Sequence, residues 1–166
     1  MRQAVFCVSA ALDRIALWLC LAATALLTVM ILIIVVMRYG FGQGHLQLQD
    51  LASYAFAVLV AFSVPVCLAR EGHVRVEVFS EHMPAAYRYW ADVVALLLFL
   101  IPVFGLLIWA WAPQLAYSWA IREASLETGG LGGLFLVKTA LPVAAAMTIV
   151  QGIALVLRKR QGQDGA

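Results

Sequence analysis

Three histidines are the first side chains to test for chemistry, because imidazole binds haem iron and transition metals. A haem held between membrane helices needs histidines that face each other from two helices of the bundle. His45, His73 and His82 all lie in polar connections between long apolar runs. This placement argues against haem ligation. The chain would otherwise be the membrane anchor of a haem- or quinone-linked respiratory enzyme, and that alternative stays open.

The acidic and sulfur-containing side chains indicate no reaction centre. Glu77 and Glu81 would share one face of a helix, but no nucleophile or metal-binding group accompanies them, and a solvated face beside Arg75 explains their spacing. The cysteines are odd in number, lie in or near apolar stretches and form no CxxC pair: Cys7, Cys20 and Cys67. We therefore predict no catalytic residue, no cofactor-binding residue and no metal ligand.

The composition decides the class of protein. Of the 166 residues, 64% are hydrophobic and only 12% are charged, whereas a soluble domain is about 45–50% apolar and about 25% charged. Disorder requires low hydrophobicity and is excluded as well. No basic stripe with interleaved aromatic residues is present, so nucleic acid is not an expected partner. The length suits a single membrane domain over residues 1–166.

The elements that must position these side chains are four uncharged apolar runs. As helices they are long enough to cross a hydrocarbon core of about 30 Å. The first run is too long for the apolar region of a cleaved signal peptide. We predict an all-α integral membrane protein with four transmembrane helices at about residues 15–37, 51–69, 93–121 and 139–157. Steep tilt, a bend at Pro102 or Pro113, or an extension beyond the bilayer would accommodate the long third run.

The basic residues predict the orientation of these spans. Eight of the 11 lysines and arginines lie in the N-terminal segment, in the charged interfacial segment 70–92 between the second and third spans, and in the tail 158–166. The other three lie in the connections 38–50 and 122–138. Because positive residues concentrate on the cytoplasmic side, we predict that both termini and the tail are cytoplasmic.

The interiors of the four runs carry no Asp, Glu, Lys, Arg or His. Ionisable groups at membrane depth usually mark ion or substrate paths, so the chain by itself does not resemble a pore or a carrier. A free-standing small multidrug carrier, for example, would be expected to have a membrane-buried Glu in its first span, and residues 15–37 contain none. Hydrogen bonds between helices are the expected use of the remaining polar residues: Thr24, Thr28, Ser53, Ser63, Gln114, Ser118, Thr148 and Gln151.

The segment Gly72-His73-Val74-Arg75-Val76-Glu77 is distinctive. It resembles the G-H-[VI]-R-V-[DE] signature of the small permease subunit of tripartite ATP-independent periplasmic (TRAP) transporters, the DctQ-type family. Other landmarks follow in the family's order, namely Arg38-Tyr39 with Phe41-Gly42, Glu123-Ala124-Ser125 with the glycines after it, Lys138 with Pro142, and Gln151-Gly152. Where the family commonly has an acidic pair before the second span, this chain keeps only Asp50.

The resemblance implies a role in the bacterial inner membrane. The chain would pair with a large permease subunit that carries the sodium and substrate sites, and a periplasmic binding protein would deliver an organic acid or related solute. The chain would enlarge and anchor the immobile part of an elevator-type carrier, in contact with membrane lipid. The residues that we expect to serve structural or interface roles are Arg38, Asp50, Gly72, His73, Arg75, Glu123, Ser125, Lys138 and Gln151.

Overall fold

A computed structural model describes residues 2–70, 85–125 and 129–164 of the chain. Its helices are α1 (Arg2–Gly40), α2 (Leu46–Ala69), α4 (Ala85–Ala95), the π-helical turn η1 (Leu96–Leu100), α5 (Ile101–Ala120) and α6 (Leu134–Asp164). Because α4, η1 and α5 are continuous, the described residues contain four helices that are long and apolar enough to cross a membrane. The predicted all-α class and the count of four spans are confirmed.

The helices are longer than the uncharged runs from which the spans were predicted. The first run was expected to begin at residue 15, but α1 begins at Arg2 and passes through Asp13 and Arg14. The backbone hydrogen bonds of a helix form within the helix itself. A charged side chain therefore does not end a helix, provided that the charge is in contact with water or with a partner of opposite charge. The carboxylate of Asp13 has such a partner, the guanidinium of Arg70 at the end of α2, at 3.3 Å.

The π-helical turn η1 accommodates the proline in the third span. Pro102 lies in the first turn of α5 and has no N–H to donate to the preceding turn. The five residues before α5 widen into π-helical geometry, which is a common form of local adjustment within a helix. Of the two prolines at which a bend was one of the alternatives, Pro102 follows a local change of helix type, whereas α5 continues through Pro113.

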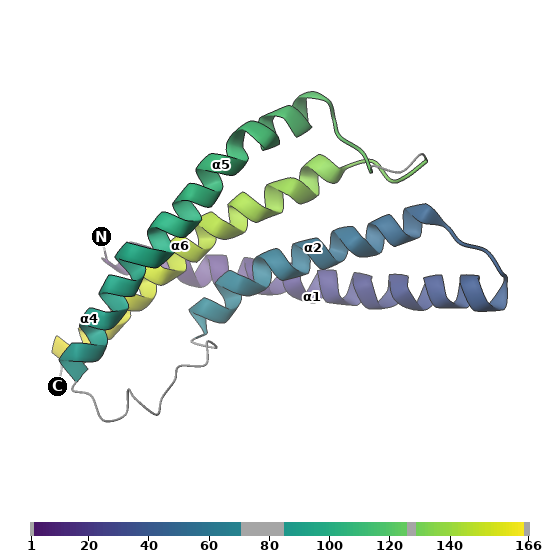
Figure 1. Cartoon of the computed structure of the whole chain (residues 1–166). Helices are drawn as coiled ribbons and strands as arrows, with labels where there is room; N and C mark the ends of the chain where they lie inside the picture. Colours follow the sequence, from purple (N-terminus) through teal and green to yellow (C-terminus); the bar gives the residue numbers. More distant parts are fainter. Residues whose placement is uncertain (1, 71–84, 126–128, 165–166) are drawn as a thin grey trace.

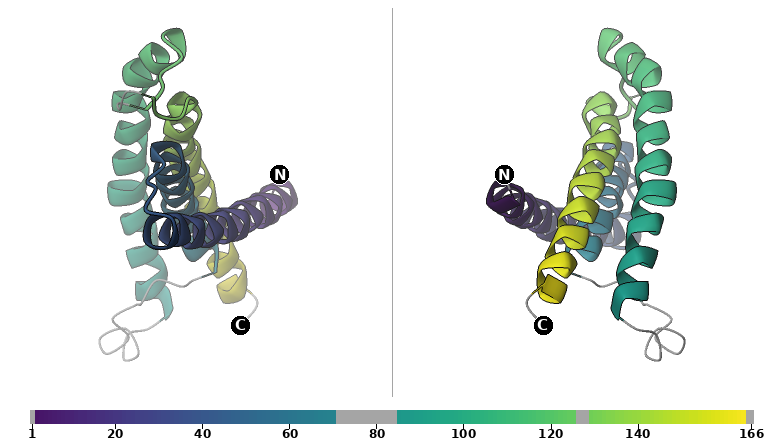
Figure 2. Two further views of the ribbon diagram at one scale, coloured as in Figure 1. Left: turned by 90° about the vertical axis from the view of Figure 1, so that its right-hand side faces the viewer. Right: turned by 90° about the vertical axis from the view of Figure 1, so that its left-hand side faces the viewer.

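The four spans form an open array. α1 packs along α2, α2 along α6, and α6 along α5, so that α2 and α6 lie in the middle and α1 and α5 at the edges (Figure 1). Figure 2 shows that α1 is strongly inclined to α5 and α6. At one end of the array lie both the connection between α1 and α2 and the connection between α5 and α6 (Figure 1).

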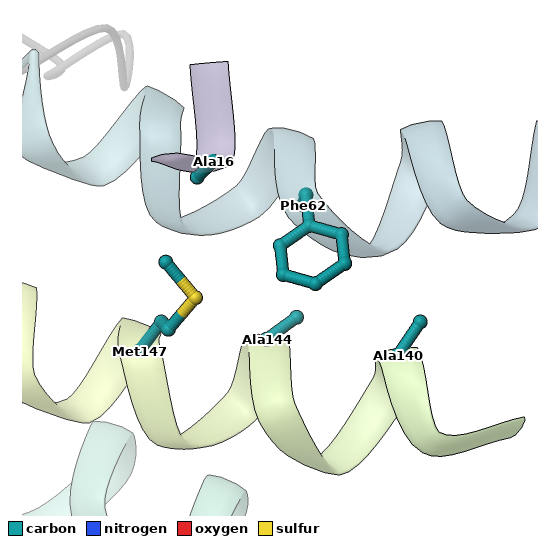
Figure 3. Close-up of a cluster of buried hydrophobic side chains, with 5 residues drawn as sticks. All are labelled: Ala16, Phe62, Ala140, Ala144 and Met147. Atoms are coloured by element: carbon teal, nitrogen blue, oxygen red, sulfur yellow. The ribbon is translucent and has the colours of Figure 1, made fainter. Parts of the chain in front are cut away.

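The core of the array lies where α2 faces α6 (Figure 3). Phe62 of α2 packs among Ala140, Ala144 and Met147 of α6, and Ala16 of α1 closes the cluster. The alanines let the helix backbones approach closely, which is the main source of packing energy between helices in lipid. Large apolar side chains cover the outside instead, and Trp18, Leu98 and Trp109 are among the most exposed.

Candidate functional site

A polar cluster joins α2, α5 and α6 at the end of the array where the two connections lie. We define it as Asp50 and Tyr54 of α2, Ser118 of α5, Glu123 in the connection and Lys138 of α6. Asp50 and Tyr54 are one turn apart on α2, and both contact Leu131 in the connection before α6. The Asp50 carboxylate accepts the Leu131 N–H at 2.9 Å. The Tyr54 hydroxyl donates to the Leu131 carbonyl at 3.0 Å.

The connection itself is shaped by a short bridge and by glycines. Ala124 pairs with Gly132 in an antiparallel bridge, and the Ser125 N–H donates to the Leu131 carbonyl at 3.0 Å. At Gly130 a Cβ atom would lie 2.5 Å from Cβ of Ser125 and 2.7 Å from Oδ2 of Asp50. Only a residue without a side chain lets the backbone come this close to the carboxylate.

The second half of the cluster is an ion pair between the connection and α6. Nζ of Lys138 donates to Oε2 of Glu123 at 2.6 Å and to Oγ of Ser118 at 3.3 Å. The two charged side chains are 19% and 17% exposed, so they are partly shielded from water. The hydrogen bonds that the Glu123 carboxylate accepts from Lys138 and, second, from Ser118 hold the pKa of Glu123 below its ordinary value.

A separate polar contact lies at the opposite end of the array. The Oγ of Ser9 on α1 donates to Oε1 of Gln151 on α6, and Nε2 of Gln151 donates to the Ser9 carbonyl at 2.9 Å. Both residues are buried at 2% exposure. The exchange of two hydrogen bonds satisfies the amide of Gln151 in an apolar surrounding, where an unpaired amide would be costly.

The structure brings together four of the residues expected from the sequence. Asp50, Glu123, Ser125 and Lys138 lie around the same connection, but they bond one another and the loop backbone rather than projecting outward. Gln151 belongs to the opposite end, and Arg38 is exposed in the last turn of α1. The remaining candidates lie outside the described residues: Gly72, His73 and Arg75.

One expectation about packing was wrong. All six hydroxyls predicted to join helices donate to carbonyls of their own helix instead, namely those of Thr24, Thr28, Ser53, Ser63, Ser118 and Thr148, whereas Gln151 does bond another helix. A hydroxyl in a helix reaches the carbonyl one turn back, and this local bond competes with longer ones. Ala145 of α6 is only 2% exposed, because its own chain covers it.

Several functional contacts were missed by sequence reasoning. Tyr54 lies in an apolar run but carries a polar hydroxyl group. It follows Asp50 by four residues, and this spacing indicates that the two side chains lie on the same face of a helix. The partners Ser9 and Gln151 are separated by 142 positions, and Asp13 and Arg70 by 57. No spacing rule connects such distant residues.

The cluster is suited to holding a loop in place. The Glu123 carboxylate accepts a hydrogen bond from the Lys138 ammonium group, and the Asp50 carboxylate accepts one from the Leu131 N–H in the loop. In the part of the chain that the structure describes, no three His, Cys, Asp or Glu side chains come together as a metal would require.

Comparison with known proteins adds one finding. The sequence model of a family described as "Tripartite ATP-independent periplasmic transporters, DctQ component" matches residues 27–162. The matched range contains α2, α5, the polar cluster and Gln151. No curated protein matches this sequence.

Proposed function

The chain belongs to the DctQ component family of tripartite ATP-independent periplasmic transporters, and we infer that it supports a large permease subunit during sodium-driven uptake of an organic acid. It is a multi-pass membrane subunit of the small permease type. In the proposed complex, the large subunit holds the sodium and substrate sites in the bacterial inner membrane. A periplasmic binding protein delivers the solute.

The family match over residues 27–162 is the observation that carries this proposal. The distribution of polar groups supports a scaffold role for the chain. The charged residues of the polar cluster are bonded to one another and to the loop, whereas moving ions through a site requires ligands that bind and release them. The family match does not support the alternative of a respiratory-enzyme anchor, since DctQ is a transporter component.

The open array gives the scaffold a physical form. α1 and α5 lie at its edges and present large apolar side chains such as Leu32 and Leu106, which are 60% and 61% exposed. These faces suit contact with lipid or with the helices of the large subunit. In an elevator-type carrier, part of the assembly stays fixed while the rest moves. The connection between α5 and α6, which is bonded to Asp50 and Tyr54, and the α2–α6 core would help to keep this subunit rigid.

Transport in reconstituted vesicles tests the proposal. The chain and a large permease subunit of the same transporter would be co-purified and placed in vesicles with the loaded binding protein and an inward sodium gradient. We expect uptake of an organic acid only when both membrane subunits and the gradient are present. Uptake of equal rate by the large subunit alone would contradict the scaffold role.

A single variant separates a scaffold from an ion site. Asp50→Asn removes the charge of Asp50 but keeps an oxygen that can accept the Leu131 N–H. We expect the assembled complex to show an unchanged dependence of uptake on sodium concentration. A shift of several-fold in that dependence, with the complex still assembled, would mean that Asp50 contributes to an ion site.

A further inference from the structure

An apolar groove of about 470 Å³ lies between α2, α6 and the third span, toward the end opposite the polar cluster. We define the apolar groove by Leu68 of α2, Leu96 and Leu100 of η1, Val103 of α5, and Leu155 and Val156 of α6. Its volume is within the range of small-ligand sites, which are mostly apolar with a few polar groups at fixed places. Three separate helices contribute to its walls, so it is more than a gap between neighbouring side chains.

Two local features of the helices shape the walls of the apolar groove. The π-helical turn η1 widens the third span where Leu96 and Leu100 line the groove. On the facing side α6 has Gly152, where a Cβ atom would lie 2.9 Å from Cδ1 of Leu96. The missing side chain lets the π-helical turn sit close to α6 at this level, while Val103 and Val156 line the groove beside it.

One end of the apolar groove is charged. Asp92 of α4 is the single ionisable residue among the described residues of its wall. Arg158 follows Leu155 by one helical turn, and both residues line a smaller adjoining hollow. The Arg158 guanidinium is exposed and lies 5.8 Å from the centre of the Phe6 ring. By the positive-inside rule this end lies at the cytoplasmic surface.

We propose that the apolar groove binds one acyl chain of an anionic phospholipid, with the lipid phosphate at Arg158. A concave apolar surface inside a bilayer loses contact energy if it stays empty, and hydrocarbon chains are the molecules around it. Arginine binds phosphate through two parallel hydrogen bonds, and basic pockets between membrane helices at the cytoplasmic side bind anionic head groups.

Native mass spectrometry of the full chain tests the proposal. The protein would be equilibrated in detergent micelles with equal parts of phosphatidylglycerol and phosphatidylcholine, then washed with lipid-free detergent. We expect about one phosphatidylglycerol to remain on the wild-type chain. Val103→Trp fills the groove and should lower this retention about threefold or more, since contacts of this kind in lipid are individually modest. Ala95→Trp, at a second position of the wall, should act in the same way.

Matched variants separate the groove from general effects. Leu106→Trp adds the same side chain on α5 at an exposed position outside the groove and should retain lipid as the wild type does. Arg158→Gln should abolish the preference for phosphatidylglycerol, whereas Arg122→Gln, at the other end of the array, should not.

Equal retention in Val103→Trp, Ala95→Trp and Leu106→Trp would overturn the proposal. So would loss of the large permease subunit, rather than lipid, when the two groove variants are purified as a complex with that subunit. The lipid proposal requires only that the helices span a bilayer. A failure of the lipid experiment would therefore not bear on sodium-driven transport, and a failure of the transport experiment would not bear on lipid binding.

Discussion

The carboxylate of Asp50 holds the backbone N–H of Leu131 at 2.9 Å, although the two residues are 81 positions apart. Tyr54, one turn along the same helix, bonds the carbonyl of the same Leu131 at 3.0 Å. A single helix therefore satisfies both backbone groups of one loop residue. This fixes the connection between α5 and α6 onto the hairpin of α1 and α2, and it joins the two halves of the array at that end.

Removing the acceptor at residue 50 should loosen this connection. Asp50→Ala leaves the Leu131 N–H without its partner, and such a loss costs about 1–3 kcal/mol for a shielded group. We expect a lower thermal unfolding temperature in detergent and faster hydrogen exchange at the Leu131 amide. Asp50→Asn retains an oxygen acceptor and should keep most of the protection. Equal exchange in wild type and Asp50→Ala would contradict the assigned bond.

Gly130→Ala should destabilise the same connection through crowding. The added Cβ would lie 2.5 Å from Cβ of Ser125 and 2.7 Å from Oδ2 of Asp50, and overpacking of this kind costs about 1–3 kcal/mol. Gly132→Ala is the matched control, because nothing lies within 4 Å of a Cβ at that position. Thermal unfolding of both variants measures the difference. A control that lost as much stability as Gly130→Ala would argue against the close approach.

The sequence predicts the spans well and their polar contacts poorly, for a physical reason. A span is a local property, since an uncharged apolar run must cross the membrane as a helix. The extension of α1 back to Arg2 lies outside this local signal, and there Asp13 pairs with the distant Arg70. Asp50, Glu123 and Lys138 were correctly placed at span ends, but spacing alone does not show that they bond within the chain. Which helix neighbours which depends on packing of residues such as Phe62 and Ala144.

The ion pair of Glu123 and Lys138 should make stability depend on acid pH. The pKa of Glu123 is lowered from 4.5 chiefly by its hydrogen bond from Lys138. A carboxyl group with a lowered folded-state pKa contributes stability above its unfolded pKa, and this is lost as pH falls through the folded value. We expect the stability advantage of wild type over Glu123→Gln to be complete near neutral pH and to shrink below about pH 4.5.

Unfolding temperatures of the two proteins across the acid range measure this advantage. Comparing them at each pH cancels the titration of the other carboxyl groups. In a Lys138→Met background the pKa of Glu123 should return toward its ordinary value, and Glu123→Gln should then have little pH-dependent effect. An advantage that stayed constant from neutral pH to about pH 3 would be inconsistent with the lowered pKa.

The buried contact at the opposite end should show strong coupling between its members. Ser9→Ala leaves Oε1 of Gln151 buried without the hydroxyl that donates to it, at a cost of about 1–3 kcal/mol. Ser9→Ala combined with Gln151→Leu removes both side-chain partners, so the double variant should be more stable than the sum of the single losses implies. A double-mutant cycle by thermal unfolding measures this coupling. Strict additivity would show that the two side chains do not depend on each other.

Single-cysteine labelling tests the orientation of the chain. The reporter positions would be introduced one at a time in a background that lacks Cys7, Cys20 and Cys67. The basic residues concentrate near both termini and in the segment 70–92 between the second and third spans, which predicts that both termini face the cytoplasm. A membrane-impermeant thiol reagent added to intact cells should therefore label Gly44→Cys and Gly132→Cys but not Gln163→Cys. Because the connections carrying Gly44 and Gly132 lie at the same end of the array (Figure 1), these two positions must respond alike. Labelling of only one of them would contradict the arrangement of the helices, whereas labelling of Gln163→Cys alone would preserve that arrangement and reverse its orientation in the membrane.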